Sequence, residues 1–228
     1  MIRTLRIVAA GVALAAVSAA SAGGPGPESR ARALESLAQT RSQDDVAEAI
    51  AMLHAQLAGG PDNAEALVLA LRNGATVRLA VPNSHAGAPE LMDTMVFETP
   101  LGAMGWAEVA IALGVTGEVL ARAGVMEPER AQLQAALLGG VIELGERSVV
   151  TPGVLRLRAD GLEWPEIARM AGARAGTVRA ALDAMGREVR KLRPLPRPAM
   201  LVVRSVRSPG PGYLVHGHGR PQERAEGD

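Results

Sequence analysis

The chain has 228 residues, no net charge at neutral pH, no cysteine and only four aromatic residues. Disulfide-stapled folds and cysteine-ligated metal sites are therefore excluded. The length suffices for one domain with a substantial core, and a core built almost without aromatic rings favours closely packed helices over a β-sandwich.

The first 22 residues are predicted to be a secretory signal peptide. Arg3 and Arg6 precede an apolar run over 7–20, which ends at the small-residue cleavage motif Ala20-Ser21-Ala22. Because this run is shorter than the roughly 20 residues that span a bilayer, we expect cleavage and no stable membrane span afterwards. The sequence therefore predicts an exported protein, either periplasmic or extracellular.

Residues 23–28 are predicted to form a linker, and residues 29–193 a single, mainly helical domain. A first helix is expected over 29–39. A second helix is expected after Ser42, which makes an S-x-x-D capping signal with Asp45. The domain therefore begins with a helical pair.

Two further units are predicted within this domain. The first, over about 61–122, contains a helix, a strand over 76–81 with alternating apolar residues, and a second helix. The second unit, over about 128–192, opens with Pro128 at a favourable first helical position and ends in two helices. A short strand over 141–144 in the second unit is expected to pair with the strand of the first, giving a two-stranded β pair.

The end of the chain has a different composition. From Pro194 onward, prolines and glycines are too frequent for packed regular structure, except in a candidate edge strand over 200–203. We therefore expect residues 194–228 to form a flexible tail.

The two units share a motif, which predicts an internal duplication. The first unit carries W-x-E-V-A-x-x-x-G and the second carries W-x-E-I-A-x-x-x-G. The shared positions are Trp106, Glu108, Gly114, Trp164, Glu166 and Gly172. Because two copies are too few for a solenoid, we expect one pseudo-symmetric core in which both tryptophans are buried.

The sharpest local pattern runs from residue 161 to 179, with Ala168, Gly172 and Val178 at the positions where a helix-turn-helix places a small residue, a turn glycine and a β-branched residue. Together with the basic stretch that follows, to residue 193, it resembles the DNA-binding region of bacterial sigma factors. That resemblance implies that four residues face DNA: Arg174, Thr177, Arg179 and Arg187. Any tight helical corner uses the same residue types, and this structural interpretation is favoured, with a DNA-binding regulator as the alternative.

A wider resemblance covers most of the chain after the signal peptide. The segments T-P-L-G-A-M-G-W at 99–106, Q-L-Q-A-A-L-L-G-G at 132–140 and G-L-E-W at 161–164 resemble a family of small exported proteobacterial proteins with T-P-x-G-x-M-G and G-M-G-W-G-x-I-A signatures. The resemblance implies export and points to no particular activity. This chain has Glu163 and Pro165 where the second signature favours glycines.

The sequence offers little support for catalysis. Glu108 and Glu166 occupy matched positions, and as a converging carboxylate pair they would suit acid–base work or a cation, which gives a second alternative, a hydrolase. A glutamate in a first helical turn more commonly complements the helix dipole. The chain has no G-x-S-x-G, S-x-x-K, H-E-x-x-H or phosphate-loop motif. We therefore expect no cofactor, no metal and no enzymatic activity.

A basic stripe near the end of the domain predicts an anion-binding surface. Its members are Arg174, Arg179, Arg187, Arg190, Lys191 and Arg193. Residues 44–147 hold 14 acidic and five basic side chains, whereas residues 148–228 hold 14 basic and eight acidic ones, so the stripe lies in the positive half. Arginine suits phosphate and carboxylate groups, which makes an anionic envelope polymer or protein the expected partner. The alternative is a face that neutralises the acidic half. Either way, the sequence predicts an exported, non-catalytic protein with a binding or structural role.

Overall fold

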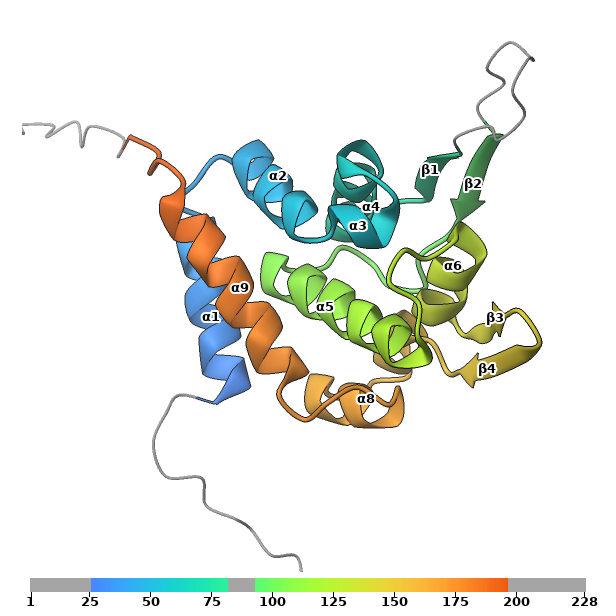
Figure 1. The fold of residues 1–228 in the computed structure, drawn as a ribbon. Helices are drawn as coiled ribbons and strands as arrows, with labels where there is room; N and C mark the ends of the chain where they lie inside the picture. Colours follow the sequence, from blue (N-terminus) through green and yellow to red (C-terminus); the bar gives the residue numbers. More distant parts are fainter. Residues whose placement is uncertain (1–25, 82–92, 197–228) are drawn as a thin grey trace, which may run out of the picture. The chain divides into compact units, whose positions relative to one another are not determined.

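The computed structural model describes residues 26–81 and 93–196. The predicted signal peptide and the candidate strand at 200–203 lie outside the described residues. Within them the chain is mainly helical, as predicted, and it has two small antiparallel sheets of two strands each (Figure 1). Among these residues, no helix combines the length and the apolar character needed to cross a membrane.

The domain begins with three helices, α1 (Pro27–Ala38), α2 (Gln43–Leu53) and α3 (Ala55–Ala58). The predicted cap of the second helix is confirmed, because the Ser42 hydroxyl accepts a hydrogen bond from the Asp45 amide. The predicted start of the first helix was two residues late. Pro27 occupies the first helical turn, where its missing N–H costs nothing.

The first unit consists of α4 (Pro61–Asn73), β1 (Val77–Val81), β2 (Asp93–Phe97) and α5 (Trp106–Ala123). The strands β1 and β2 are antiparallel, and Val77 and Leu79 face the core opposite Phe97 and Met95. The predicted pairing of the first strand with residues 141–144 was therefore wrong, because each strand pairs with its neighbour in the sequence.

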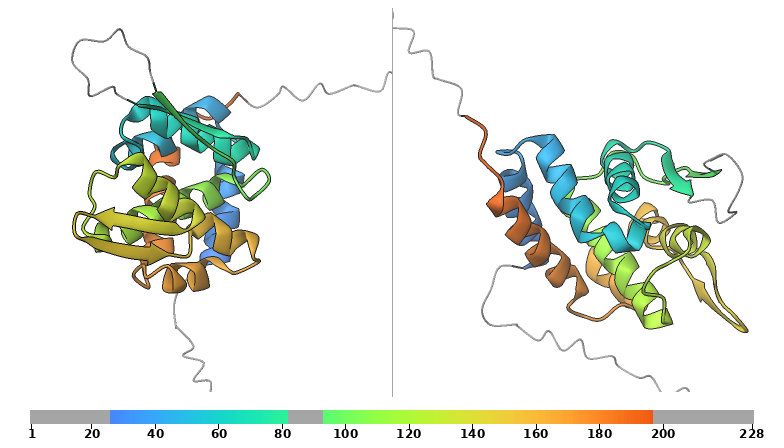
Figure 2. Two further views of the ribbon diagram at one scale, coloured as in Figure 1. Left: turned by 90° about the vertical axis from the view of Figure 1, so that its right-hand side faces the viewer. Right: turned by 45° about the horizontal axis from the view of Figure 1, so that its top comes forward.

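The second unit consists of α6 (Arg130–Leu138), β3 (Gly140–Leu144), β4 (Arg147–Thr151), α7 (Val154–Ala159), α8 (Trp164–Met170) and α9 (Thr177–Lys191). The first of these helices starts two residues after Pro128, because Glu129 is the N-cap and its amide donates to the Gln132 side chain. The β3–β4 hairpin extends away from the helices (Figure 2).

The order of elements repeats in the two units. Each contains a helix, a β-hairpin and a later helix whose first residue is tryptophan. The copies differ in detail, because α7 is inserted before the tryptophan helix of the second unit, and that helix has 7 residues against 18 in the first. The repeat therefore lies in the order of elements rather than in their lengths.

The core is organised around α5, which packs against α1, α4, α6, α7 and α9. Eleven of its 18 residues are buried, so apolar side chains point to all sides, as expected for a central helix. Gly114 lets α9 come close, because a methyl group at this position would lie 2.7 Å from the Ala181 Cβ atom. Figures 1 and 2 show α1 and α9 side by side against this helix.

Candidate functional site

The basic stripe predicted from the sequence lies mainly along α9. The helix is amphipathic, and its buried face is formed by Val178, Leu182, Met185 and Val189. On the opposite side, Arg179, Arg187 and Arg190 are exposed and fall at helical spacing on one face. Arg193 follows the helix and is also exposed. The helix therefore presents several guanidinium groups to solvent.

Three of the six predicted cations have acidic partners. Arg174 lies 2.9 Å from Glu118 of α5, between its Nε and the carboxylate oxygen. Arg179 pairs with Asp183 on its own helix, and Asp183 is also bound by Arg30 of α1 at 3.0 Å. Of the paired cations, Arg174 is the one that contacts an acidic residue in the more acidic half of the chain, residues 44–147.

The third paired cation is Lys191, whose ammonium lies 2.7 Å from Glu188 on the same helix. By contrast, Arg187, Arg190 and Arg193 make no hydrogen bond or ion pair with any residue that the structure describes. These three arginines are called the free arginines below. They form an exposed positive surface on which no hydrogen bond or ion pair to another described residue is made.

The corner between α8 and α9 has the local geometry expected from the sequence. Ala168 and Val178 are buried, and Gly172 has a φ of 79°, a left-handed conformation that suits glycine in a tight turn. Arg122 of α5 donates to the Gly172 carbonyl at 2.6 Å. The corner is thus packed into the domain through α5, and α1 lies along the helix that follows it.

Both tryptophans of the repeated motif are buried, as predicted, with exposed fractions of 1% for Trp106 and 7% for Trp164. The Trp106 indole donates to the Gln43 side-chain oxygen of α2 at 2.9 Å. Arg72, in the last turn of α4, lies over this ring at 4.9 Å from its centroid and donates to the Met104 carbonyl. The first ring is therefore fixed by one arginine and one amide.

The second tryptophan has an equivalent arginine but no equivalent amide. Arg158, at the end of α7, lies 5.2 Å from the Trp164 ring centroid. It donates to the Leu162 carbonyl at 3.0 Å, two residues before the ring, just as Arg72 does before its own ring. The Trp164 indole nitrogen, however, is buried and has no hydrogen-bond partner among the residues that the structure describes.

The structure gives the two glutamates of the repeated motif different surroundings. Glu108 accepts the Gly105 amide at 3.2 Å through one oxygen and binds Arg158 at 2.8 Å through the other. Glu166 instead lies 3.8 Å from Arg169 on its own short helix and is about half exposed. Glu108 therefore completes a helix cap and an ion pair.

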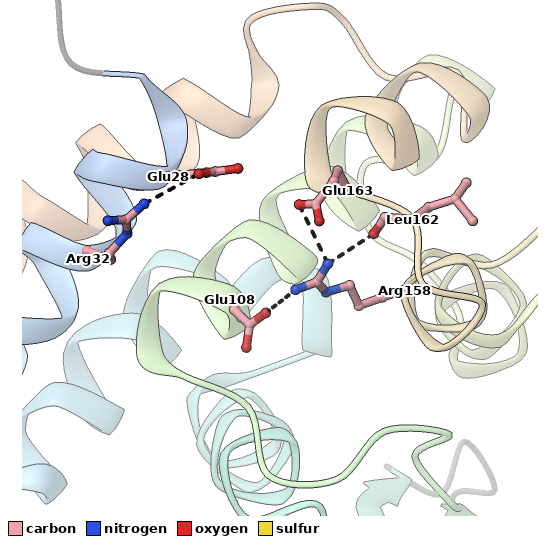
Figure 3. A network of polar contacts seen from close by, with 6 residues as sticks. All are labelled: Glu28, Arg32, Glu108, Arg158, Leu162 and Glu163. Atoms are coloured by element: carbon pink, nitrogen blue, oxygen red, sulfur yellow. Dashed lines mark hydrogen bonds and ion pairs between the residues drawn. The ribbon is translucent and has the colours of Figure 1, made fainter.

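A pocket of about 530 Å³ lies beside this ion pair, between α1, α5, α7, α8 and the start of α9. Figure 3 shows the Arg158 guanidinium between Glu108 and Glu163, with the Glu28–Arg32 pair of α1 nearby. Sequence reasoning missed the role of Arg158, because it arises from a contact with Glu108, 50 residues earlier in the chain. Within residues 26–81 and 93–196, no group of acidic or histidine side chains is arranged to hold a metal ion.

A second, smaller hollow of about 230 Å³ lies along α5 and is lined by His54, Leu57, Leu113 and Gly117 among others. Burial lowers the pKa of His54 to about 4, because a poorly solvated site disfavours the charged imidazolium. At neutral pH this histidine is therefore uncharged.

No known protein family matches the chain, and no curated protein or solved structure shows significant similarity to it.

Proposed function

We propose that the chain is an exported, non-catalytic protein that binds a polyanionic partner through the exposed face of α9. The observation that carries the proposal is the set of free arginines, Arg187, Arg190 and Arg193, which are exposed and lack acidic partners among the described residues. The signal-peptide pattern of the first 22 residues supports the exported part.

The pairing pattern favours an external partner over internal neutralisation. If the stripe served to neutralise the acidic half of the chain, its cations would contact acidic residues of that half. Only Arg174 does so, through Glu118, while Arg179 and Lys191 pair within α9. Guanidinium groups left in water at helical spacing are well suited to phosphate, sulfate or carboxylate groups of a partner.

The DNA-binding alternative receives less support from the same face. Asp183 lies on this side of α9 and is paired with Arg179, one of the four residues that the helix-turn-helix resemblance would place against DNA. Its ion pair with Arg30 also ties α1 to this side of the helix. The hydrolase alternative is weakened because Glu108 and Glu166 are engaged by different arginines.

Retention on a polyanionic resin tests the proposal. The chain from residue 23 should bind heparin at low salt and elute as salt rises, because released counterions drive such binding. Reversing two charges with Arg187→Glu and Arg190→Glu should abolish most of the retention. The matched control reverses two exposed arginines on the strands, Arg78→Glu and Arg147→Glu, which changes the net charge equally and should leave most of the retention.

Two outcomes would count against the proposal. If the α9 reversals lower the melting temperature but leave retention unchanged, the face serves the fold instead of a partner. If both double variants lose retention equally, net charge alone is responsible. Retention on duplex DNA far beyond that on heparin would favour the DNA-binding alternative.

A further inference from the structure

We propose that two copies of this chain associate through the outer edge of β4, which pairs antiparallel with β4 of the second copy. This surface is separate from the free arginines and goes beyond the function proposed for them. The inference comes from comparing the hairpins of the two units, because each has one edge that is closed by a neighbouring helix and one that is not.

The first strand of each hairpin has its outer edge closed by a side chain of the preceding helix. In the first unit the Asn63 side chain accepts from the Ala80 amide at 2.8 Å and donates to the Ala80 carbonyl at 3.0 Å. In the second unit the Gln132 side chain donates to the Glu143 carbonyl at 2.7 Å. Asn63 and Gln132 are each the third residue of their helix, α4 and α6. This polar cap therefore recurs in both units, and it hinders a further strand from pairing with β1 or β3.

The same hydrogen bonds show which backbone groups of β4 point outwards. Hydrogen-bonded and non-hydrogen-bonded residue pairs alternate along an antiparallel hairpin. The Glu143 carbonyl is bound from outside the hairpin, so its pair with Ser148 is not hydrogen-bonded. The next pair but one, Val141 with Val150, is then of the same kind. The N–H and C=O groups of Ser148 and Val150 therefore point away from β3, and none of them has a hydrogen-bond partner among the described residues.

The side chains of β4 are exposed as well. Four of its five residues are exposed, and Val150, at 78%, is the most exposed large apolar residue in the part of the chain that the structure describes. Figure 2 shows the hairpin projecting from the helices, which leaves its outer edge accessible to another chain. An exposed strand edge with apolar side chains is a template for pairing with a further strand.

The second strand of the first hairpin, β2, is less suited to pairing. Its residues Thr94 and Val96 are exposed, but Met95 between them already packs against the core. In β4 the residue between the two outward-facing positions is Val149, which is 39% exposed. A further strand would therefore bury new apolar surface at β4 and little at β2.

The hydrogen-bonding pattern of β4 suits a second copy in one register. A two-fold axis between the two Val149 residues places Ser148 of each copy opposite Val150 of the other, so that all the outward-facing groups are used. An axis at Val150 would place Ser148 opposite Pro152, which has no N–H. An axis at Ser148 would place Val150 opposite Glu146, which lies in the hairpin turn.

This register also joins the apolar cores of the two copies. The Val149 side chains face each other in a non-hydrogen-bonded pair, in which Cβ atoms lie about 5 Å apart. Each Val149 is paired within its own hairpin with Ile142, which is buried in the core. The result is a four-stranded sheet with four β-branched side chains in a row, and such a sheet is more stable than a lone hairpin. Because Gln132 closes the edge of β3 in both copies, assembly ends at the dimer.

Sedimentation velocity on the chain from residue 23 onward tests the proposal. A monomer–dimer equilibrium is expected between about 10 µM and about 1 mM, since small interfaces associate weakly. Val150→Pro removes an outward-facing N–H that the hairpin does not use, and two hydrogen bonds are lost per dimer. It should lower the association constant at least about tenfold. Val96→Pro is the matched control, because it removes the outward-facing N–H at the equivalent position of β2, and it should leave association unchanged.

A charge exchange at position 149 tests the register. Val149→Lys and Val149→Glu should each be monomeric, because like charges would lie directly opposite each other at the two-fold axis. An equimolar mixture of the two variants should form dimers again, since the opposed charges then attract. Recovery on mixing also shows that both variants are folded.

Four results would overturn the proposal. The chain could remain monomeric up to the highest concentration, Val150→Pro could associate as the parent does, Val96→Pro could weaken association equally, or the mixture of position-149 variants could stay monomeric. Growth beyond a dimer would contradict the closed edge of β3 and would count against the proposal too. None of these variants changes a residue of α9, so the heparin test of the free arginines is decided separately.

Discussion

His54 is the residue whose protonation is most strongly coupled to folding among those that the structure describes. Its pKa is lowered by burial to about 4 in the folded protein and is about 6.5 in an unfolded chain. Below pH 6.5 the unfolded chain binds a proton that the folded protein excludes, so stability falls as the pH drops from about 6.5 towards 4. Above pH 6.5 this residue is neutral in both states, so it no longer lowers the free energy of unfolding.

The expected loss is roughly 1 to 3 kcal/mol, given 1.4 kcal/mol per unit of pKa difference and the partial exposure of the ring. Urea unfolding at pH values from about 7.5 to about 5 measures it. In His54→Gln, which cannot titrate, the decline over this range should be smaller by that amount. An equal decline in both proteins would mean that other groups cause it.

At the scale of residues, the sequence predicted which residues of the repeated motif are important but not which residues they contact. The motif identified Trp106, Trp164 and Glu108, and both rings are buried as predicted. Arg158, which binds Glu108 and covers the second ring, could not be predicted, because a single sequence records spacing along the chain and not contacts 50 residues apart. The same limit applies to the pocket, which exists only where five helices meet.

At the scale of elements, helices were predicted well and strands poorly. Residues 177–192 were expected as the last helix, and α9 covers Thr177–Lys191, because its apolar stripe is continuous. The strands β2 and β4 were missed, since Arg147–Thr151 does not alternate between apolar and polar residues. Gly145 was a sequence signal for this second hairpin, because glycine is typical of two-residue hairpin turns. Its φ of 70° fits such a turn. A local hairpin also closes a shorter loop than the expected pairing of residues 76–81 with 141–144, so it costs less conformational entropy.

The close approach of α5 and α9 makes a second prediction at this scale. Gly114→Ala would place a methyl group 2.7 Å from the Ala181 Cβ atom, so the helices must move apart. We expect a destabilisation of about 1 to 3 kcal/mol, the usual range for overpacking a core. Thermal or urea unfolding measures it.

Gly117→Ala is the matched control, because this glycine lies in the same helix and a methyl group there meets nothing within 4 Å. It should stabilise the protein by about 0.5 to 1 kcal/mol, since alanine loses less conformational freedom in a helix than glycine does. If both substitutions stabilise the protein, the helix contact is looser than the structure indicates.

At the scale of the whole domain, the loop that follows α1 is bonded to α9 and to the residues after it. Arg41, which is buried, donates to the Val189 carbonyl at 3.3 Å, and the Leu195 amide donates to the Thr40 carbonyl at 2.9 Å. With no disulfide in the chain, such contacts and the apolar core hold the two ends of the domain together. Periodicity predicted both helices but could not predict that they are neighbours.

Localisation is the prediction that concerns the molecule as a whole. A C-terminal epitope tag followed by cell fractionation should recover the protein in the periplasm or the medium, shortened by about 22 residues as expected for a cleaved signal peptide. Recovery of only the full-length protein in the cytoplasm would contradict export. That result would also favour DNA binding as the meaning of the helix-turn-helix resemblance.

The burial of α5 on all sides has an evolutionary consequence. Substitutions at its eleven buried positions change packed contacts, so selection for folding alone should keep those positions almost fixed during divergence. Folding places no such demand on the charges of Arg187, Arg190 and Arg193, which make no hydrogen bond or ion pair with a described residue. Among descendants of this sequence, these arginines would be replaced freely unless a partner selects for them. Their conservation would therefore indicate a binding function, whereas conservation of α5 would indicate only selection for folding.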